Sequence, residues 1–269
     1  MIDAARVLAL QERLLARAQQ PPARDWLPVV MADREIGIAG PEVAGFLASR
    51  TPHFALVDDR LRLLDAGLDV ARRSALLHDC ALRLRDAGLL TGWRAELLDI
   101  RPTPDSAPVA TIERAACRAL GITTTAVHLN AFTAAGELIV ARRAGHKQID
   151  PGLWDNLVGG MVPAGESEEQ ALVREAQEEA GFDLDVTTLS RGGRVHVTRP
   201  VPEGFQSEIV QVFDTVLADD TELRNQDGEV AAIERRPVAL VLEAIERDEF
   251  TLESALVTLD ALLRRAGGH

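Results

Sequence analysis

The sequence predicts an α+β protein in two parts, a small α+β N-terminal domain in residues 1–110 and a strand-rich domain in residues 111–269. Three observations support this division. The chain has 269 residues, 46% of them apolar, which is enough for one large core or two ordinary ones. The segment RPTPDSAPVA, residues 101–110, concentrates three prolines, breaks any regular element and is the best candidate for a linker. Apolar alternation after it indicates a sheet with a few helices beside it.

The N-terminal part is predicted to alternate helices with hairpins. Apolar runs around short polar turns are typical of hairpins, and apolar residues at helical spacing indicate helices. The expected elements are a helix from Asp3, hairpins in residues 27–40 and 53–65, helices over 41–49 and 69–87, and a strand in 93–100.

The second part is expected to contain mainly strands. TTTAVHLNAF, residues 123–132, is rich in β-branched residues, and ELIVARR, residues 137–143, is its expected antiparallel partner. The other expected elements are a short helix in 112–121, strands in 192–198 and 207–217, a turn in 225–229 and helices through Leu263.

Charge and cysteine content exclude several classes of function. A net charge of −13 argues against coating nucleic acid or binding anionic membranes, because both depend on Lys and Arg neutralising phosphates. No apolar run reaches 18 residues and the N-terminal stretch mixes charges into a helical stripe, so a cytoplasmic protein is expected. Cys80 and Cys117 lie far apart without metal-ligand spacing, and we expect two buried thiols.

The stretch GGMVPAGESEEQALVREAQEEAGF, residues 159–182, contains a strongly marked helix. Ser167 and Gln170 form a capping-box pattern and Gly181 stands where a helix C′ residue would, which predicts a helix over residues 168–180. The expected core face of this helix is Leu172, Val173, Ala176 and Ala180. A second arc carries Glu168, Glu175, Glu178 and Glu179, with the small Ala171 expected to leave space above them.

Carboxylates crowded on one helix are unfavourable unless something binds them. Like charges three or four residues apart destabilise a helix by a few tenths of a kcal/mol per pair, and here they lie near the negative end of the helix dipole. A divalent cation such as Mg²⁺, which shares its coordination with substrate phosphates, would offset both costs. The alternative is an ordinary solvated acidic face.

The spacing of the whole segment decides between these interpretations. Gly160, five residues, Glu166, seven residues and then REAQEEAGF, residues 174–182, resembles the Nudix box of the Nudix hydrolase family, with every fixed position filled. The resemblance implies an α/β/α sandwich with a mixed sheet that hydrolyses a diphosphate linked to another group. Ala176 stands where a larger aliphatic residue is usual, which affects packing more than chemistry.

The resemblance also implies roles for individual residues. Glu175, Glu178 and Glu179 would hold the divalent ions, Mg²⁺ or Mn²⁺, with the backbone carbonyl of Gly160. The arginine matching Arg174 orients a catalytic glutamate, and the glutamate matching Glu166 helps fix the loop.

Two further acidic roles follow from the chemistry. One of Glu178 and Glu179 is the natural base for a water bound to the metal. Outside the box, Glu229 in NQDGEV is a candidate for the acid that completes the site, the alternative being a surface turn residue. Asp227 and Glu222 are weaker candidates.

The resemblance extends beyond the box to a particular branch of the family. Segments such as PGLWDNLVGGMVPAGES and FTLESALVTLDALLRR are similar to thiamin pyrophosphokinase-associated Nudix proteins, which carry an extra N-terminal domain. That branch implies thiamin diphosphate, or a damaged analogue, as the substrate, with monophosphate and phosphate as products. It also implies a possible homodimer.

The residues before the box suit an anionic ligand that carries a ring. Arg142, Arg143 and Lys147 are candidates for phosphate binding, although each could lie in a solvated loop. Trp154 could stack on a heteroaromatic ring or belong to the core. Asp155 and Asn156 could contact the ring or hold the loop.

Three other functions compete with this prediction. The same box serves nucleoside di- or triphosphate pyrophosphohydrolases. An isopentenyl-diphosphate isomerase shares the scaffold but needs a catalytic cysteine near the sheet, and neither Cys80 nor Cys117 is expected to lie there. A non-catalytic binding module is the third alternative, but such modules usually lose box carboxylates, which are all present here.

Overall fold

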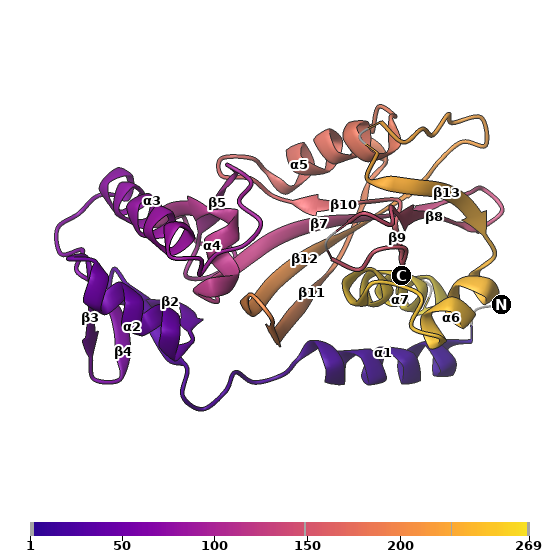
Figure 1. Ribbon diagram of the computed structural model, residues 1–269. Coiled ribbons are helices and arrows are strands. Elements are labelled where there is room, and N and C mark those ends of the chain that lie inside the picture. Colours follow the sequence, from indigo (N-terminus) through magenta and orange to yellow (C-terminus); the bar gives the residue numbers. More distant parts are fainter. Residues whose placement is uncertain (1–2, 148, 227, 268–269) are drawn as a thin grey trace.

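A seven-stranded mixed sheet forms the centre of the larger part of the molecule (Figure 1). The computed structural model describes residues 3–147, 149–226 and 228–267. The strands of this sheet are β7 (Thr123–Phe132), β8 (Leu138–Arg143), β9 (Trp154–Asn156), β10 (Val158–Met161), β11 (Ser190–Val201), β12 (Gly204–Val216) and β13 (Val230–Arg236). Their order is β11-β12-β7-β8-β13, with β10 added on β7 and β9 on β8. Only the β12–β7 pair among these is parallel, so the predicted mixed sheet is confirmed.

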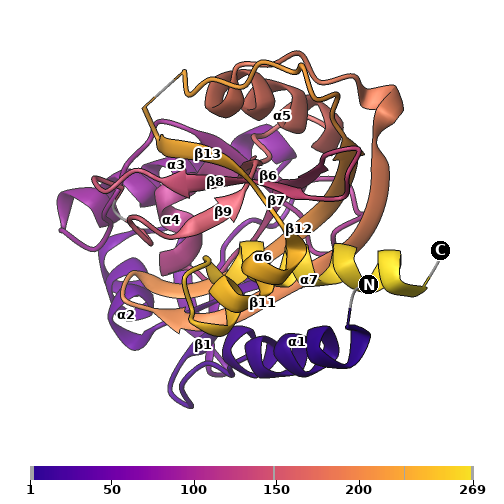
Figure 2. The ribbon, with the colours of Figure 1, turned by 90° about the vertical axis from the view of Figure 1, so that its right-hand side faces the viewer.

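Helices cover both faces of this sheet, as Figures 1 and 2 show. One face carries α5 (Glu168–Glu175), the π-type turn η1 (Ala176–Ala180) and the short 3₁₀ turn η2 (Val186–Thr188). The opposite face carries α1 (Ala4–Ala18), α6 (Val238–Glu246) and α7 (Leu252–Gly267). Neighbours along β7 alternate between the two cores, since Ala126 packs on the α7 side and Val127 on the α5 side. The α/β/α sandwich is thereby confirmed.

The N-terminal part has its own sheets and core. Its elements are β1 (Leu27–Met31), β2 (Arg34–Ala39), α2 (Pro41–Arg50), β3 (Phe54–Val57), β4 (Arg60–Leu63), α3 (Val70–Asp86), β5 (Leu97–Ile100), β6 (Ala110–Glu113) and α4 (Arg114–Ala119). The first four strands form a sheet in the order β2-β1-β4-β3, and β5 pairs with β6. Both predicted hairpins are confirmed, and Cys80 and Cys117 are buried free thiols as expected.

Two details of the predicted boundaries differ. Residues 101–109, where a linker was predicted, close the antiparallel hairpin of β5 and β6. Strand β6 takes Ile112 and Glu113, so the following helix α4 begins only at Arg114. The local proline content marks a break in regular structure equally well for a hairpin loop and for a linker.

The first helix packs with the second part of the chain. Val7, Leu10 and Leu14 of α1 lie in the core that also contains α7 and the large sheet. The bidentate contact of Arg6 with Glu246 joins α1 to α6. The predicted division at residue 110 stays a prediction, but packing associates α1 with the larger sheet.

A very close backbone contact attaches the N-terminal sheet to α4. The Ile38 amide donates to the Leu120 carbonyl at 2.8 Å. A Cβ atom at Gly37 would lie 2.3 Å from that carbonyl oxygen, and one at Gly121 would lie 2.5 Å from the Ile38 oxygen. Glycine is therefore required on both sides of the contact.

Within the described part of the chain, none of the helices combines the length and apolar character needed to span a bilayer.

Candidate active site

The helix of the opening motif is capped as its sequence predicts. The Ser167 hydroxyl accepts from the Gln170 amide, and the Gln170 side chain accepts from the Ser167 amide, which is the reciprocal capping box. The α-helix ends at Glu175 and continues as one wider π-type turn, which places Glu178 and Glu179. Gly181 then ends it in the left-handed conformation, φ 66°. Turns of this kind inside helices are frequent at functional sites.

The buried face of the helix differs from the prediction at two positions. Leu172, Ala176 and Ala180 are buried as expected, but Val173 is exposed and Ala171 is fully buried in the same core. The predicted space for a ligand above Ala171 is therefore wrong, because the sheet occupies it. Of the predicted carboxylates, Glu175 and Glu179 instead face the loop of residues 159–161.

Arg174 connects the carboxylates of the motif. Its guanidinium donates to Glu175 at 2.9 Å, to Glu178 at 3.1 Å and to Glu166 at 3.3 Å. It also donates to the Met161 carbonyl at 3.4 Å, which ties the helix to strand β10. Burial alone would lower the pKa of Arg174, but Glu175 and the other acids raise it above its ordinary value. The arginine is thus charged and holds three glutamates in one arrangement.

Two of the carboxylates lie directly on the glycine loop. Glu179 accepts from the Gly159 amide at 3.0 Å, and burial raises its pKa to about 8. A Cβ atom at Gly160 would lie 2.2 Å from the Glu175 carboxyl, so this carboxyl rests against the Gly160 backbone. Burial also raises the pKa of Glu175, and the charge of Glu175 adds to the rise at Glu179.

This donor set fits a divalent cation, although it is not a preformed cage. Glu175 and Glu179 are neighbouring acids whose ionisation is disfavoured, and a hard cation bound between them would stabilise their charged forms. Glu178 is half exposed and is held by Arg174, away from the loop amide that binds Glu179. Across residues 3–147, 149–226 and 228–267, no three His, Cys, Asp or Glu side chains already converge as a metal cluster.

Lys147 and Glu229 form an ion pair beside the motif. Burial would raise the pKa of Glu229, but the hydrogen bond and charge of Lys147 lower it below its ordinary value. Lys147 is also close enough to lower the pKa of Glu179. Glu229 itself lies just before β13. Asp227 lies outside the described residues.

Arg143 and Trp154 occupy different environments. Arg143 donates to Asp155 at 2.9 Å, and both line the groove described below. Trp154 is 7% exposed and belongs to the core on the α7 side. Its ring is contacted by the guanidinium of Arg236 at 4.4 Å and of Arg142 at 5.6 Å. The structure does not bring Trp154 or Arg142 to the groove.

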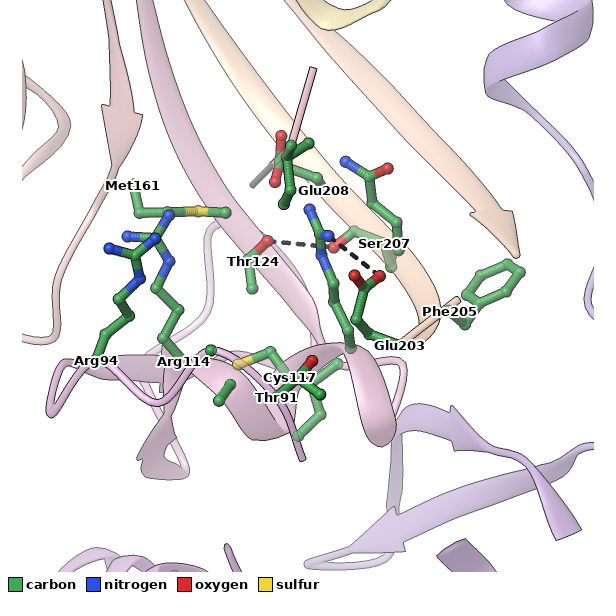
Figure 3. Close-up of a pocket in the computed structure, with 16 residues that line it drawn as sticks. Thr91, Arg94, Arg114, Cys117, Thr124, Met161, Glu203, Phe205, Ser207 and Glu208 are labelled. Carbon is green, nitrogen blue, oxygen red and sulfur yellow. Dashed lines mark hydrogen bonds and ion pairs between the residues drawn. The ribbon is translucent and has the colours of Figure 1, made fainter. Parts of the chain in front are cut away.

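A groove of about 480 Å³ runs from the glycine loop to the N-terminal part, a volume typical of small-ligand sites. Gly159 and Gly160 line one end of it. Its other walls include four charged residues that the sequence interpretation missed: Arg114, Arg118, Glu208 and Glu253. A second cavity adjoins it and shares Arg114, Arg118 and Glu208 (Figure 3). A glutamate inside the apolar strand of residues 207–217 was an available signal, because charged groups are seldom buried without a function or partner.

A buried polar network supports the base of the loop. Asn156 donates to Asn130 at 2.9 Å and to Thr258 at 3.0 Å, and its side-chain oxygen lies 2.8 Å from a ring nitrogen of His128. Of the two roles considered for Asn156, this geometry favours holding the loop. His128 lines the groove and takes part in this network.

Two family models match the chain. A model described as the NUDIX domain matches residues 122–256, and a model described as a domain of unknown function (DUF4743) matches residues 8–124. The first contains the whole loop and helix just described, and the second contains α4 with Arg114 and Arg118.

The chain is also similar to named relatives and to solved structures. Nudix hydrolase 20, chloroplastic, from Arabidopsis thaliana is 32% identical over 71% of this chain and 53% of its own length. An isopentenyl-diphosphate Delta-isomerase from Leifsonia xyli is 36% identical over 47% of this chain and 69% of its own. A Deinococcus radiodurans crystal structure is 24% identical over 63% of this chain and 98% of its own, with a TM-score of 0.49. The chain spans about half the length of the Arabidopsis relative.

Proposed function

The chain belongs to the Nudix family, and on that premise we propose that it hydrolyses the diphosphate bond of a small organic diphosphate. The observation that carries this proposal is the set of Glu175 and Glu179 on the Gly159–Gly160 loop, at the end of a groove large enough for a ligand. All carboxylates of the motif are present, which supports an enzyme over a binding module. Thiamin diphosphate, or a damaged analogue of it, is the proposed substrate, giving the monophosphate and phosphate.

The proposed cofactor is Mg²⁺ or Mn²⁺. Glu175, Glu179 and the carbonyl of Gly160 would hold it. When bound, such an ion lowers the pKa of a coordinated water and neutralises charge on the phosphates. The raised pKa of Glu179 disfavours its anion in the metal-free protein, and metal binding requires that anion.

The remaining box residues position the reaction. Glu178 is the proposed base, because its carboxylate is half exposed and reachable by water, while Arg174 holds it at 3.1 Å. Arg174 is a positioning residue that also fixes Glu166 on the loop. Among the candidate residues before the box, Arg143 lies on the groove wall and is the proposed ligand of the phosphate.

Thiamin diphosphate is supported by the resemblance of the sequence to the thiamin-associated branch, and nucleoside diphosphate derivatives are the main alternative within the same reaction class. Isomerisation of isopentenyl diphosphate is less well supported. Cys117 reaches the cavity next to the groove, closer than predicted, but burial raises its thiol pKa to about 12. A thiol with such a pKa is protonated at neutral pH and is a weak nucleophile.

A substrate panel tests this proposal. The pure protein is incubated with Mg²⁺ or Mn²⁺ and thiamin diphosphate, oxidised thiamin diphosphate, ADP-ribose, nucleoside triphosphates or isopentenyl diphosphate. We expect metal-dependent release of thiamin monophosphate and phosphate, with slower turnover of the others. Faster turnover of a nucleotide would show that nucleotides, rather than thiamin diphosphate, are the substrate class. An absence of metal-dependent turnover for every compound would contradict the proposal that the protein is an enzyme.

A cytoplasmic location and a homodimer remain predictions, which cell fractionation and light scattering would check.

A further inference from the structure

Glu208 is a carboxylate buried in the wall of the groove. It lies on β12 and is 6% exposed, and within the described part of the chain its side chain makes no hydrogen bond or ion pair. It lines both the groove at the glycine loop and the adjoining cavity, and Figure 3 shows it among the residues that surround that cavity. Its acceptor capacity is therefore directed at the space where a ligand would lie.

Its neighbours show that this is a property of Glu208 rather than of every acid nearby. Glu253 accepts from the Gln206 amide at 2.7 Å and lies 3.5 Å from Arg199. Glu203 lies 3.6 Å from Arg118. The carboxylate of Glu208 has no comparable contact. Burial and the charge of Glu253 raise its pKa, as expected for an acid without a direct partner.

Arg114 connects Glu208 with the metal end of the groove. Its guanidinium donates to Glu96 at 2.8 Å, and its positive charge partly offsets the burial that raises the pKa of both Glu175 and Glu208. Gly160, Arg114 and Glu208 line the same groove. A diphosphate bound at the loop would therefore extend its organic group past Arg114 towards Glu208.

We propose that Glu208 accepts hydrogen bonds from N–H or O–H donors of the group attached to the diphosphate, and that this contact selects the substrate. The inference rests on the proposed function and adds a residue that chooses among diphosphates. An amino-substituted heterocycle and a ribose share the required donor chemistry. A group that lacks donors would leave Glu208 buried and unpaired in the complex. A polar group left unpaired in this way discriminates strongly against such a substrate.

The first test separates substrates with and without donors. For Glu208→Gln, the KM for thiamin diphosphate or ADP-ribose, whichever the wild type hydrolyses, is expected to rise roughly tenfold, with kcat changed less than threefold. For methyl diphosphate, which has no donor on its organic group, KM is expected to stay within twofold. Glu203→Gln is the matched control, since Glu203 lines the same groove but is already paired with Arg118. An unchanged KM for the donor-bearing substrate in Glu208→Gln overturns the inference.

A binding experiment keeps the inference separate from catalysis. Calorimetry measures thiamin monophosphate and AMP binding to the wild type, to Glu208→Gln and to Glu208→Ala. A loss of affinity of roughly tenfold or more for thiamin monophosphate alone assigns the ring amine, a loss for AMP alone assigns the ribose hydroxyls or the adenine amine, and a loss for both assigns a donor-accepting role for either kind of group. Unchanged affinity for both overturns the inference. If no diphosphate is hydrolysed but the variants still lose affinity, the proposed function fails and the Glu208 contact stands.

Each variant is first checked for folding by thermal unfolding. Glu208→Gln removes a buried, unpaired charge, so its Tm is expected to equal or exceed that of the wild type. Should one variant fail to fold, the other carries both tests.

Discussion

The two ends of the groove use buried carboxylates in opposite ways. At the glycine loop, Glu175 and Glu179 are bound by Arg174 and by a backbone amide, and their positions are set before any ligand arrives. At the far end, Glu208 is more deeply buried, at 6% exposed, but has no such restraint. The difference separates two tasks. Chemistry needs groups fixed relative to one another, whereas substrate choice needs a group whose hydrogen bonds are left for the ligand.

The largest expected effect concerns the fixed end. Glu178→Gln should lower kcat roughly 100- to 10,000-fold, because the amide cannot take a proton from water. The Mg²⁺ concentration for half activation should change little in this variant, and it should rise strongly in Glu179→Gln, which loses a metal ligand. Steady-state kinetics at varied Mg²⁺ measure both values. A Glu178→Gln, Glu179→Gln double variant with wild-type turnover would contradict the assignment of the site.

The next effect is a pH dependence of stability in the metal-free protein. The pKa of Glu179 rises from 4.5 to about 8 on folding, so its contribution to stability is complete below pH 4.5 and is lost as the pH rises towards 8. Each pH unit in this window costs about 1.4 kcal/mol. Glu179→Gln should remove this loss. The free energy of unfolding of this variant, relative to that of the wild type, should therefore be higher at pH 8 than at pH 5.

Urea unfolding in EDTA at these two pH values measures the difference. Glu178→Gln serves as the control, because the side chain of Glu178 is 52% exposed. A wild type and Glu179→Gln variant with the same pH profile would show that Glu179 ionises normally in the fold.

The smallest expected effect lies outside the groove altogether. Trp154→Phe should leave the KM for the substrate within twofold, because the indole packs in the core against Arg236 and Arg142. Its cost should appear as a lower Tm, since the ring fills core volume. A large rise in KM with an unchanged Tm would instead support the prediction from the sequence that Trp154 contacts the substrate.

The loop and helix of the site could be predicted because their chemistry is local in sequence. The capping residues, Gly181 and the spaced glutamates all lie within residues 159–182. Each acts through neighbours only a few positions away, so a single sequence is enough to predict its place in the helix. The failures at Ala171 and Val173 arose because ideal helical spacing does not tell which flank of a narrow apolar face meets the sheet.

The far end of the groove could not be found in this way. Arg114 and Glu208 are 94 positions apart in the sequence and meet only because α4 lies beside β12 in the fold. The short strands β9 and β10 were also missed, since three- and four-residue strands carry too little alternation to recognise. The burial of Trp154 depended likewise on Arg236, which lies on β13, far along the chain.

The tight contact between Ile38 and Leu120 gives the N-terminal sheet a mechanical part in recognition. Helix α4 has only six residues, too few to hold its direction without support. Its C-terminal end is fixed by the Ile38 amide and by two glycines that admit no side chain. The four-stranded sheet thus supports α4 and fixes the positions of Arg114 and Arg118. An added methyl group at Gly37 or Gly121 would displace α4 relative to that sheet, and both arginines with it, without touching any residue of the groove.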